Sequence, residues 1–160
     1  MRELVLMRHG EALSVRESGA ESDADRRLSP RGKDQASASA GRLKALGFVP
    51  DVIISSPLLR AVETADLAAA VFPSAVRLRE PALASDASPE AILEALRSAA
   101  GEAPSVLVTG HQPAMGGMSG LLLNSPPPPF HTGSFAYFRL AEAAGRHAAE
   151  LAEFFTPERI

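Results

Sequence analysis

Three short apolar runs, separated by amphipathic stretches, constrain the fold of this 160-residue chain more than any other feature of its sequence. They occupy residues 4–7, 51–55 and 105–109. Runs of this kind are typical of strands buried on both faces of a parallel sheet. Because helical patterns follow them, the sequence predicts an α/β fold of three layers, with a mainly parallel sheet and helices on both of its faces.

Serine-proline pairs mark where three of the helices are expected to begin. They lie at residues 29–30, 56–57 and 88–89, and each places a capping hydroxyl before a proline at the first helical position. The first two helical patterns run to about Leu46 and Val71. Together with the apolar runs, these helix starts predict the order strand, helix, strand, helix along the first half of the chain.

The last third of the chain has a different character. We expect a weaker helix over residues 115–123, a proline-rich connector at 126–129, and two late strands over 134–140 and 148–155. We also expect His131 and His147 at the surface. The sequence shows neither internal repeats nor a change of composition that would mark a second domain. We therefore interpret residues 1–160 as a single domain.

Composition narrows the class of protein. The sequence holds no cysteine and has a formal net charge of -3. This excludes disulfides and thiolate chemistry, and it gives no reason to expect nucleic acid as a partner. The apolar stretch near Met1 is too short for a signal-peptide core or a membrane span. We therefore expect a cytoplasmic protein that does not bind membranes, and a monomer.

Reactive side chains follow the three predicted core strands. Arg8 and His9 end the first, Arg60 lies shortly beyond the second, and His111 follows the third. Because ligands of open parallel sheets bind beyond the carboxyl ends of the strands, we expect these four side chains to converge. Arg8 and His9 can share a site only if the chain leaves strand geometry there, and Gly10 would permit that turn.

Arg60 indicates which ligand such a site would take. In the first turn of its predicted helix a cation is unfavourable, because the positive end of the helix dipole lies there. A multiply charged anion such as phosphate would compensate it. The alternative is a surface arginine paired with Glu63, three residues further on. A metal site is not expected, because neither a His-x-x-x-His pattern nor an acidic triad accompanies the histidines.

Four segments together resemble the histidine phosphatase superfamily, which includes phosphoglycerate mutase. They are residues 4–11 with the Arg-His-Gly motif, residues 28–36, residues 55–64, and residues 106–113. The resemblance covers nearly the whole chain and implies a phosphoglycerate mutase-like fold. The length of the chain is similar to that of the SixA branch of phosphohistidine phosphatases, which lack large lid insertions.

The resemblance also implies roles for the site residues. His9 would be the nucleophile, attacking phosphorus as neutral imidazole and forming a phosphohistidine intermediate that water hydrolyses. Arg8, Arg60 and His111 would bind the phosphoryl oxygens and stabilise the transition state. Ser14 is a further candidate for contact with the phosphate. No cofactor is implied.

The general acid is the position at which the sequence departs from the family. Many relatives use a carboxylate after the third strand, and the candidates here are Glu80 and Asp86. Because a leaving imidazole departs protonated or nearly so, phosphohistidine needs less acid catalysis than an ester. Together with the short stretch of residues 73–89, this favours an open site for phosphohistidine on another protein. Three alternatives remain: a phosphatase of small phosphate monoesters, a phosphate-binding regulator without turnover, and a mutase.

Overall fold

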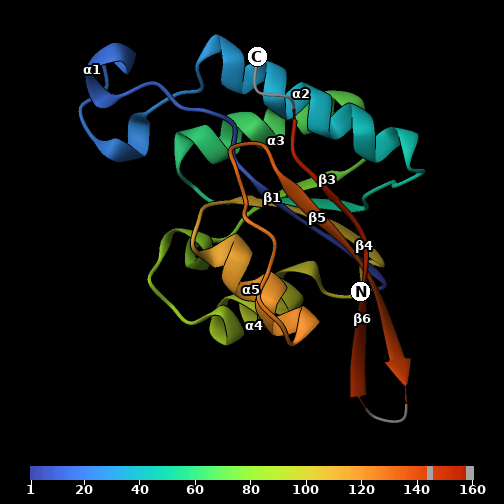
Figure 1. Ribbon diagram of the computed structural model, residues 1–160. Coiled ribbons are helices and arrows are strands. Elements are labelled where there is room, and N and C mark those ends of the chain that lie inside the picture. The colour runs from blue at the N-terminus through green and yellow to red at the C-terminus, as the bar shows by residue number, and fades with distance from the viewer. Residues whose placement is uncertain (144–145, 158–160) are drawn as a thin grey trace.

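The computed structural model (Figure 1) describes the backbone of residues 1–143 and 146–157, and the side chains of residues 1–141 and 149–157. In this part of the chain, six strands form one sheet in the order β3-β2-β4-β1-β5-β6. The ladders β3-β2, β2-β4 and β4-β1 are parallel, and β1-β5 and β5-β6 are antiparallel. The strands are β1 Glu3–Arg8, β2 Val52–Ser55, β3 Val76–Arg79, β4 Ser105–Gly110, β5 Phe135–Ala143 and β6 Arg146–Phe155.

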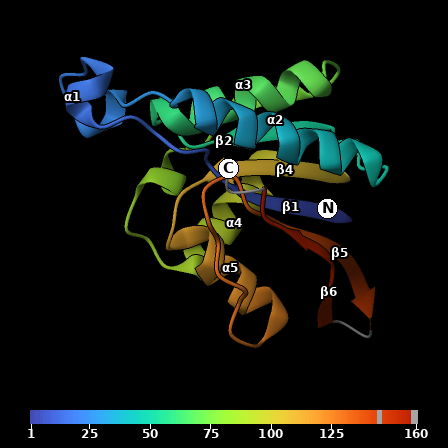
Figure 2. The ribbon, with the colours of Figure 1, turned by 45° about the horizontal axis from the view of Figure 1, so that its top comes forward.

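Helices cover the two faces of this sheet. In Figure 2, α2 and α3 lie on one side and α4 and α5 on the other, so the predicted three-layer α/β fold is confirmed. The helices are α1 Val15–Ser18, α2 Pro30–Ala45, α3 Leu59–Val71, α4 Pro89–Ala100 and α5 Ala114–Leu123, with short 3-10 turns at Asp23–Asp25 and Pro81–Ala84.

The pleat of β1 divides the core into two clusters. Leu4 and Leu6 pack among residues of α4 and α5, whereas Val5 and Met7 pack among residues of α2 and α3. All four side chains are fully buried, and burial of such a side chain stabilises a fold by about 1.5 to 3 kcal/mol. This explains why the run is continuously apolar: the strand has no solvent-facing side.

Most of the predicted elements are confirmed, with two corrections. Ser29 and Ser88 cap α2 and α4 as expected, through Gly32 N and Ala91 N. The expectation that Ser56 caps α3 is wrong, because the helix begins at Leu59 and the Ser56 hydroxyl instead accepts a hydrogen bond from Leu58 N. Strand β3 was not predicted.

The late strands are confirmed as an antiparallel hairpin that extends beyond the body of the molecule in Figure 1. It adds β5 and β6 to the edge of β1. The expectation for the side chain of His147 lies outside the described residues, and His131 is partly buried rather than fully exposed. In the described part of the chain, no helix combines the length and apolar character that a membrane span requires.

Candidate active site

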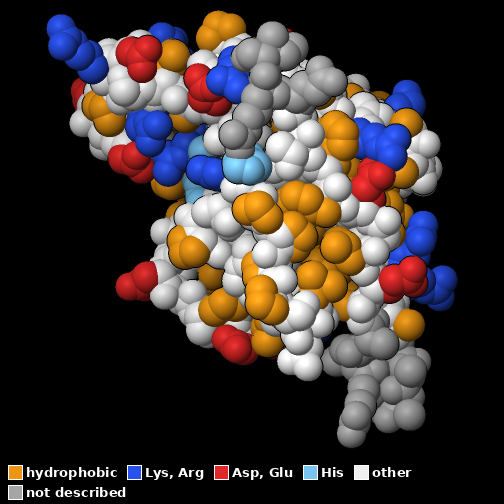
Figure 3. Space-filling model, in the orientation of Figure 1, with side chains coloured by type: hydrophobic (Ala, Val, Ile, Leu, Met, Phe, Trp, Pro, Cys, Tyr) orange, Lys and Arg blue, Asp and Glu red, His pale blue; other side chains and the backbone are white. Residues whose placement is uncertain are grey.

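The carboxyl ends of the parallel strands bring the four predicted side chains toward one place. Strand β1 ends at Arg8, immediately before His9, and β4 ends immediately before His111. The rings of His9 and His111 lie 5.2 Å apart, centroid to centroid. Arg60 lies in the first turn of α3, which follows β2. On the face in Figure 3, histidine side chains gather with arginine or lysine side chains above the apolar surface of the lower half.

His9 is held as a neutral, oriented imidazole. The residue is 8% exposed, and Nδ1 lies 2.6 Å from the carbonyl oxygen of Gly10. Because a carbonyl only accepts hydrogen bonds, Nδ1 carries the proton and Nε2 keeps its lone pair. Burial, with smaller contributions from His111, Arg60 and Arg8, lowers the pKa of His9 to about 3. The ring is therefore uncharged throughout the physiological pH range.

The low pKa of His9 makes the stability of the fold depend on pH. The pKa of His9 is about 3 in the folded chain and ~6.5 in an unfolded one. Between these values only the unfolded chain binds the proton, so the free energy of unfolding falls as the pH falls below ~6.5. We expect His9 alone to remove about 2 to 3 kcal/mol between about pH 7 and about pH 4.5. Denaturant unfolding at both pH values measures this loss. A His9→Gln variant should lack it, and an unaltered pH dependence in that variant would contradict the assignment.

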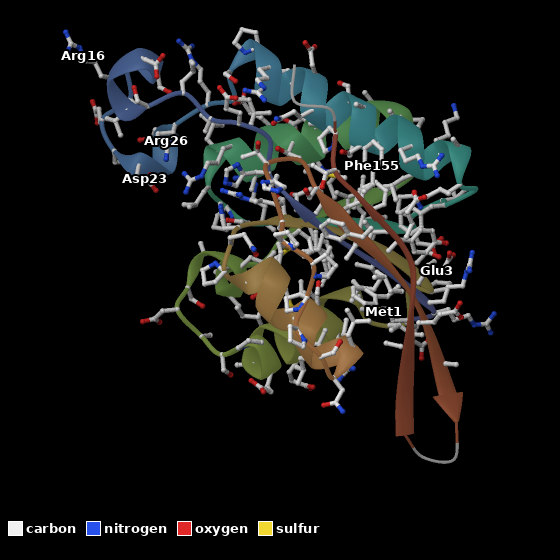
Figure 4. All side chains as sticks on the ribbon, viewed as in Figure 1. Met1, Glu3, Arg16, Asp23, Arg26 and Phe155 are labelled. Carbon is white, nitrogen blue, oxygen red and sulfur yellow. The ribbon has the colours of Figure 1, made fainter. Side chains whose placement is uncertain are left out.

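Arg60 is engaged by an anionic group of the chain itself. Its side chain donates from Nη1 to the Asp23 carbonyl at 3.0 Å and from Nη2 to Asp23 Oδ2 at 3.2 Å. Arg60 is 9% exposed, whereas the Asp23 side chain is 63% exposed. Figure 4 labels Asp23 in the loop that leads from α1 to α2. The guanidinium group near the helix N-terminus is thus compensated by a carboxylate, in agreement with the argument from the helix dipole.

Glu63 was expected, in the alternative interpretation, to pair with Arg60, but its partner is the backbone of Leu28. Its Oε1 accepts a hydrogen bond from Leu28 N at 2.9 Å. Arg60 forms its ion pair with Asp23, 37 residues earlier in the chain. The alternative of a surface pair between Arg60 and Glu63 is therefore wrong, and Arg60 faces the loop that borders the site.

Unpartnered buried polar atoms concentrate at this edge of the sheet. Among the described residues, three buried side-chain atoms have no hydrogen-bond partner, namely Arg8 Nε, His111 Nδ1 and Ser55 Oγ. Arg8 donates from Nη1 to the Phe130 carbonyl at 3.0 Å. Buried polar groups are normally paired, so a cluster of unpaired ones at strand ends indicates a ligand site.

His111 is also kept neutral. Its Nε2 lies 2.7 Å from Ser56 Oγ. The pKa of His111 is lowered to about 4, chiefly by burial and then by Arg60, while Asp23 acts in the opposite direction. The role of Ser56 in orienting this ring was not predicted, because the sequence pattern assigned its hydroxyl to a helix cap.

Gly10 serves the site by its lack of a side chain, not by an unusual backbone angle. As expected, the chain leaves strand geometry after Arg8, and Gly10 does so without a positive φ. A Cβ on Gly10 would lie 2.3 Å from the Gly32 carbonyl oxygen, and a Cβ on Gly32 would lie 2.0 Å from the Glu11 carbonyl oxygen. The motif loop and the start of α2 are thus in backbone-to-backbone contact.

This contact predicts that Gly32→Ala destabilises the protein strongly. Neither backbone can give way cheaply, so we expect a loss of about 3 kcal/mol or more. Gly41→Ala in the same helix is the matched control, because a Cβ there meets nothing within 4 Å; it should stabilise by about 0.5 to 1 kcal/mol. Thermal unfolding of both variants measures the difference, and equal melting temperatures would refute the close packing.

The remaining candidates have other partners or positions in the described part of the chain. Ser14 is exposed and caps α1 by accepting from Glu17 N. Glu80 follows β3, and its Oε1 accepts from Ala82 N. Asp86 is exposed in the loop before α4. Ser14 and Glu80 thus use their side chains as helix caps, and Asp86 is exposed to solvent.

Several supporting residues were not predicted. Thr64 Oγ1 accepts from Gly10 N at 3.1 Å and donates to the Arg60 carbonyl at 2.8 Å, which ties the motif loop to α3. Asp23 lies in a charged loop that sequence patterns cannot place in space. In the described residues, no group of three or more histidine, aspartate or glutamate side chains could hold a metal ion.

Comparison with solved structures identifies the architecture. The protein histidine phosphatase SixA, solved as a tungstate complex, is 28% identical; the alignment covers 96% of each chain with a TM-score of 0.80. A protein of Agrobacterium tumefaciens assigned as a SixA phosphohistidine phosphatase has the same fold, with a TM-score of 0.82 over 98% of each chain at 24% identity. The full described fold is therefore shared with compact SixA proteins.

Sequence comparison gives the family. The profile of the histidine phosphatase superfamily (branch 1) matches residues 4–83, half of the chain. The chain belongs to this superfamily, and its architecture is of the SixA type. Among curated proteins, the mitochondrial serine/threonine-protein phosphatase Pgam5 of Drosophila ananassae is 46% identical over 66 residues. That match spans 41% of this chain and only 22% of the relative.

Proposed function

We propose that this protein is a phosphatase that uses His9 as nucleophile and removes phosphate from phosphohistidine in another protein. The observation that carries the proposal is the state of His9: a buried neutral ring with Nδ1 bonded to Gly10 and Nε2 unprotonated. A lone pair on Nε2 is what attack on phosphorus requires. The proposal treats the whole chain as one catalytic domain.

Arg8, Arg60 and His111 bind the phosphoryl group in this mechanism. The arginines supply planar forks of donors for the equatorial oxygens. Ser56 Oγ already accepts from Leu58 N, so its hydroxyl is well placed to donate to His111 Nε2. His111 Nδ1 then carries the proton and becomes a donor that lacks a partner in the described residues. These donors stabilise the charge that develops on the phosphoryl oxygens in the transition state.

The reaction proceeds in two displacements. The lone pair of His9 Nε2 attacks phosphorus, the bond from phosphorus to the substrate nitrogen breaks, and its electron pair returns to the leaving ring. Water then attacks the phosphorylated His9 and releases phosphate, which restores the neutral imidazole. No metal takes part in these steps as proposed.

The positions of the two candidate general acids favour a substrate whose leaving group needs little acid catalysis. Glu80 is occupied in capping a 3-10 turn, and Asp86 is exposed in a loop. An imidazole that leaves already protonated on its far nitrogen needs no strong acid, unlike an alkoxide. The structurally similar SixA that was solved with tungstate is a protein histidine phosphatase, and this supports the same substrate class here.

A second candidate is phosphoserine or phosphothreonine in proteins. The segment shared with the Pgam5 serine/threonine phosphatase favours it. The deciding experiment compares the purified protein on a phosphorylated histidine-containing phosphotransfer domain, a phosphoserine peptide and sugar phosphates. We expect the highest kcat/KM on the phosphotransfer domain; faster turnover of the ester substrates would reject that preference. Phosphate binding without any turnover would favour the regulator.

We further propose a monomeric protein of the cytoplasm. The absence of cysteine from the sequence is compatible with a reducing compartment, although the Pgam5 relatives are mitochondrial. Light scattering after size-exclusion chromatography tests the first proposal, and fluorescence microscopy of a tagged chain tests the second. A dimeric mass or an organellar signal would reject them.

A further inference from the structure

A polar cavity of about 280 Å³ adjoins the site beside Arg8. The side chain of Arg8 belongs both to this cavity and to the proposed phosphoryl site, and its buried Nε has no partner in the described residues. A group attached to the bound phosphate can therefore extend into this space. The cavity is lined by Arg8, Glu11, Arg31, Gln35, His131, Thr132, Thr156 and Pro157.

Among the described residues, Glu11 is the one carboxylate of this lining, and hydrogen bonds fix its backbone on both sides. Its N–H donates to Gln35 Oε1 at 2.9 Å, and its carbonyl accepts from Ser29 N at 3.0 Å and from the Ser29 hydroxyl at 3.3 Å. The backbone of Gly32 packs directly against it. The backbone that carries the carboxylate is thus held in place, although the side chain itself is 41% exposed.

The charge of Glu11 is only partly compensated. Glu11 Oε2 lies 3.4 Å from Arg31 Nη1, and the Arg31 side chain is 44% exposed. An exposed pair of this kind contributes little to stability. A carboxylate can accept several hydrogen bonds at once, so this pair leaves Glu11 free to accept one from a ligand.

We propose that this cavity receives the imidazole ring of the phosphohistidine substrate, and that Glu11 accepts a hydrogen bond from the ring nitrogen that does not carry phosphate. The inference rests on the proposed function, and it assigns the recognition of the leaving imidazole to Glu11. A cavity of this size holds an imidazole ring, and its polar lining suits a ring with one N–H donor.

Glu11 acts on the leaving group in this scheme. A protonated far nitrogen makes the substrate ring an imidazolium, which a carboxylate stabilises. When His9 Nε2 bonds to phosphorus and the phosphorus–nitrogen bond breaks, the electron pair returns to the leaving ring. That ring keeps its far proton, bonded to Glu11, and departs as neutral imidazole. No further acid or co-reactant is needed.

The test compares two substrates in each variant. Phosphoimidazole presents the proposed ring N–H when its far nitrogen is protonated, and p-nitrophenyl phosphate has none. We expect Glu11→Gln to lower the ratio of kcat/KM for phosphoimidazole to that for p-nitrophenyl phosphate by about 10- to 100-fold. Glu17→Gln is the matched control, because it removes the same charge from the exposed helix α1 and glutamine can still accept the hydrogen bond from Ser14 N; it should leave the ratio within about twofold of the native value.

Arg31→Gln separates recognition from the ion pair. It frees Glu11 from its partner, so the ratio should not fall, whatever the change in the two individual rates, which Arg31 can affect because it also lines the cavity. A fall of the ratio in Arg31→Gln equal to that in Glu11→Gln would overturn the proposal, as would a ratio unchanged in Glu11→Gln. If the native protein hydrolyses neither substrate, or if His9→Ala hydrolyses both, the proposed function itself fails. Circular dichroism of each variant confirms that it is folded.

Discussion

Replacing His9 with alanine is expected to lower kcat/KM on phosphohistidine by at least about 10,000-fold. In the proposed mechanism the ring is the source of the lone pair that attacks phosphorus, and the bond from Nδ1 to Gly10 fixes the orientation of Nε2. The loss should appear in kcat, because the proposed phosphate-binding residues Arg8, Arg60 and His111 are left in place. Steady-state kinetics with a phosphorylated phosphotransfer domain measures it.

His9→Ala needs a control for folding, because the residue is buried. Removing a ring that is neutral in the folded state leaves no unpaired charge, so we expect a folded variant whose melting temperature at neutral pH is within several degrees of the native value. Inorganic phosphate should still protect the folded variant against thermal unfolding. Activity within about tenfold of the native rate in a folded His9→Ala variant would exclude His9 as nucleophile.

Replacing Arg60 with alanine is expected to lower kcat by about 100- to 1000-fold, the usual effect of removing one donor to a developing charge. Lysine restores the charge but not the planar fork, so Arg60→Lys should recover only a small part of the rate. The same kinetic assay applies to both variants.

Asp23 provides the test of whether Arg60 acts directly. In the structure Arg60 holds Asp23, so an alanine at position 60 also releases the loop. Asp23→Ala releases the loop and leaves Arg60 in place. We expect that variant to lose much less activity than Arg60→Ala. Equal losses in the two variants would mean that Arg60 works through the loop and not on the phosphoryl group.

Local sequence patterns predicted the core strands and most helix starts because these depend on nearby residues. Leu4 and Leu6 are fully buried within a continuous apolar run, and the Ser29 hydroxyl caps its helix three residues on. Strand β3 was missed for the opposite reason. It lies at the sheet edge, its sequence alternates two arginines with Val76 and Leu78, and three of its four residues are exposed.

The convergence of His9 and His111 followed from topology alone, because parallel strands end at one edge of the sheet. What surrounds them did not. The Asp23 contact with Arg60 spans 37 residues, and the use of the Ser56 hydroxyl depends on His111, 55 residues later. No periodicity reports such pairs. The tight packing of Gly10 on Gly32 is likewise invisible in sequence, where a glycine suggests backbone freedom rather than lack of space.

The most direct test of a neutral, lone-pair-bearing His9 is to look for the covalent intermediate. The protein is mixed with phosphohistidine substrate, quenched in alkali within milliseconds, digested, and analysed by mass spectrometry that preserves nitrogen–phosphorus bonds. The mechanism predicts acid-labile phosphate on Nε2 of His9, absent from His9→Ala. Hydrolysis without phosphate on His9, or with phosphate on His111 instead, would contradict it.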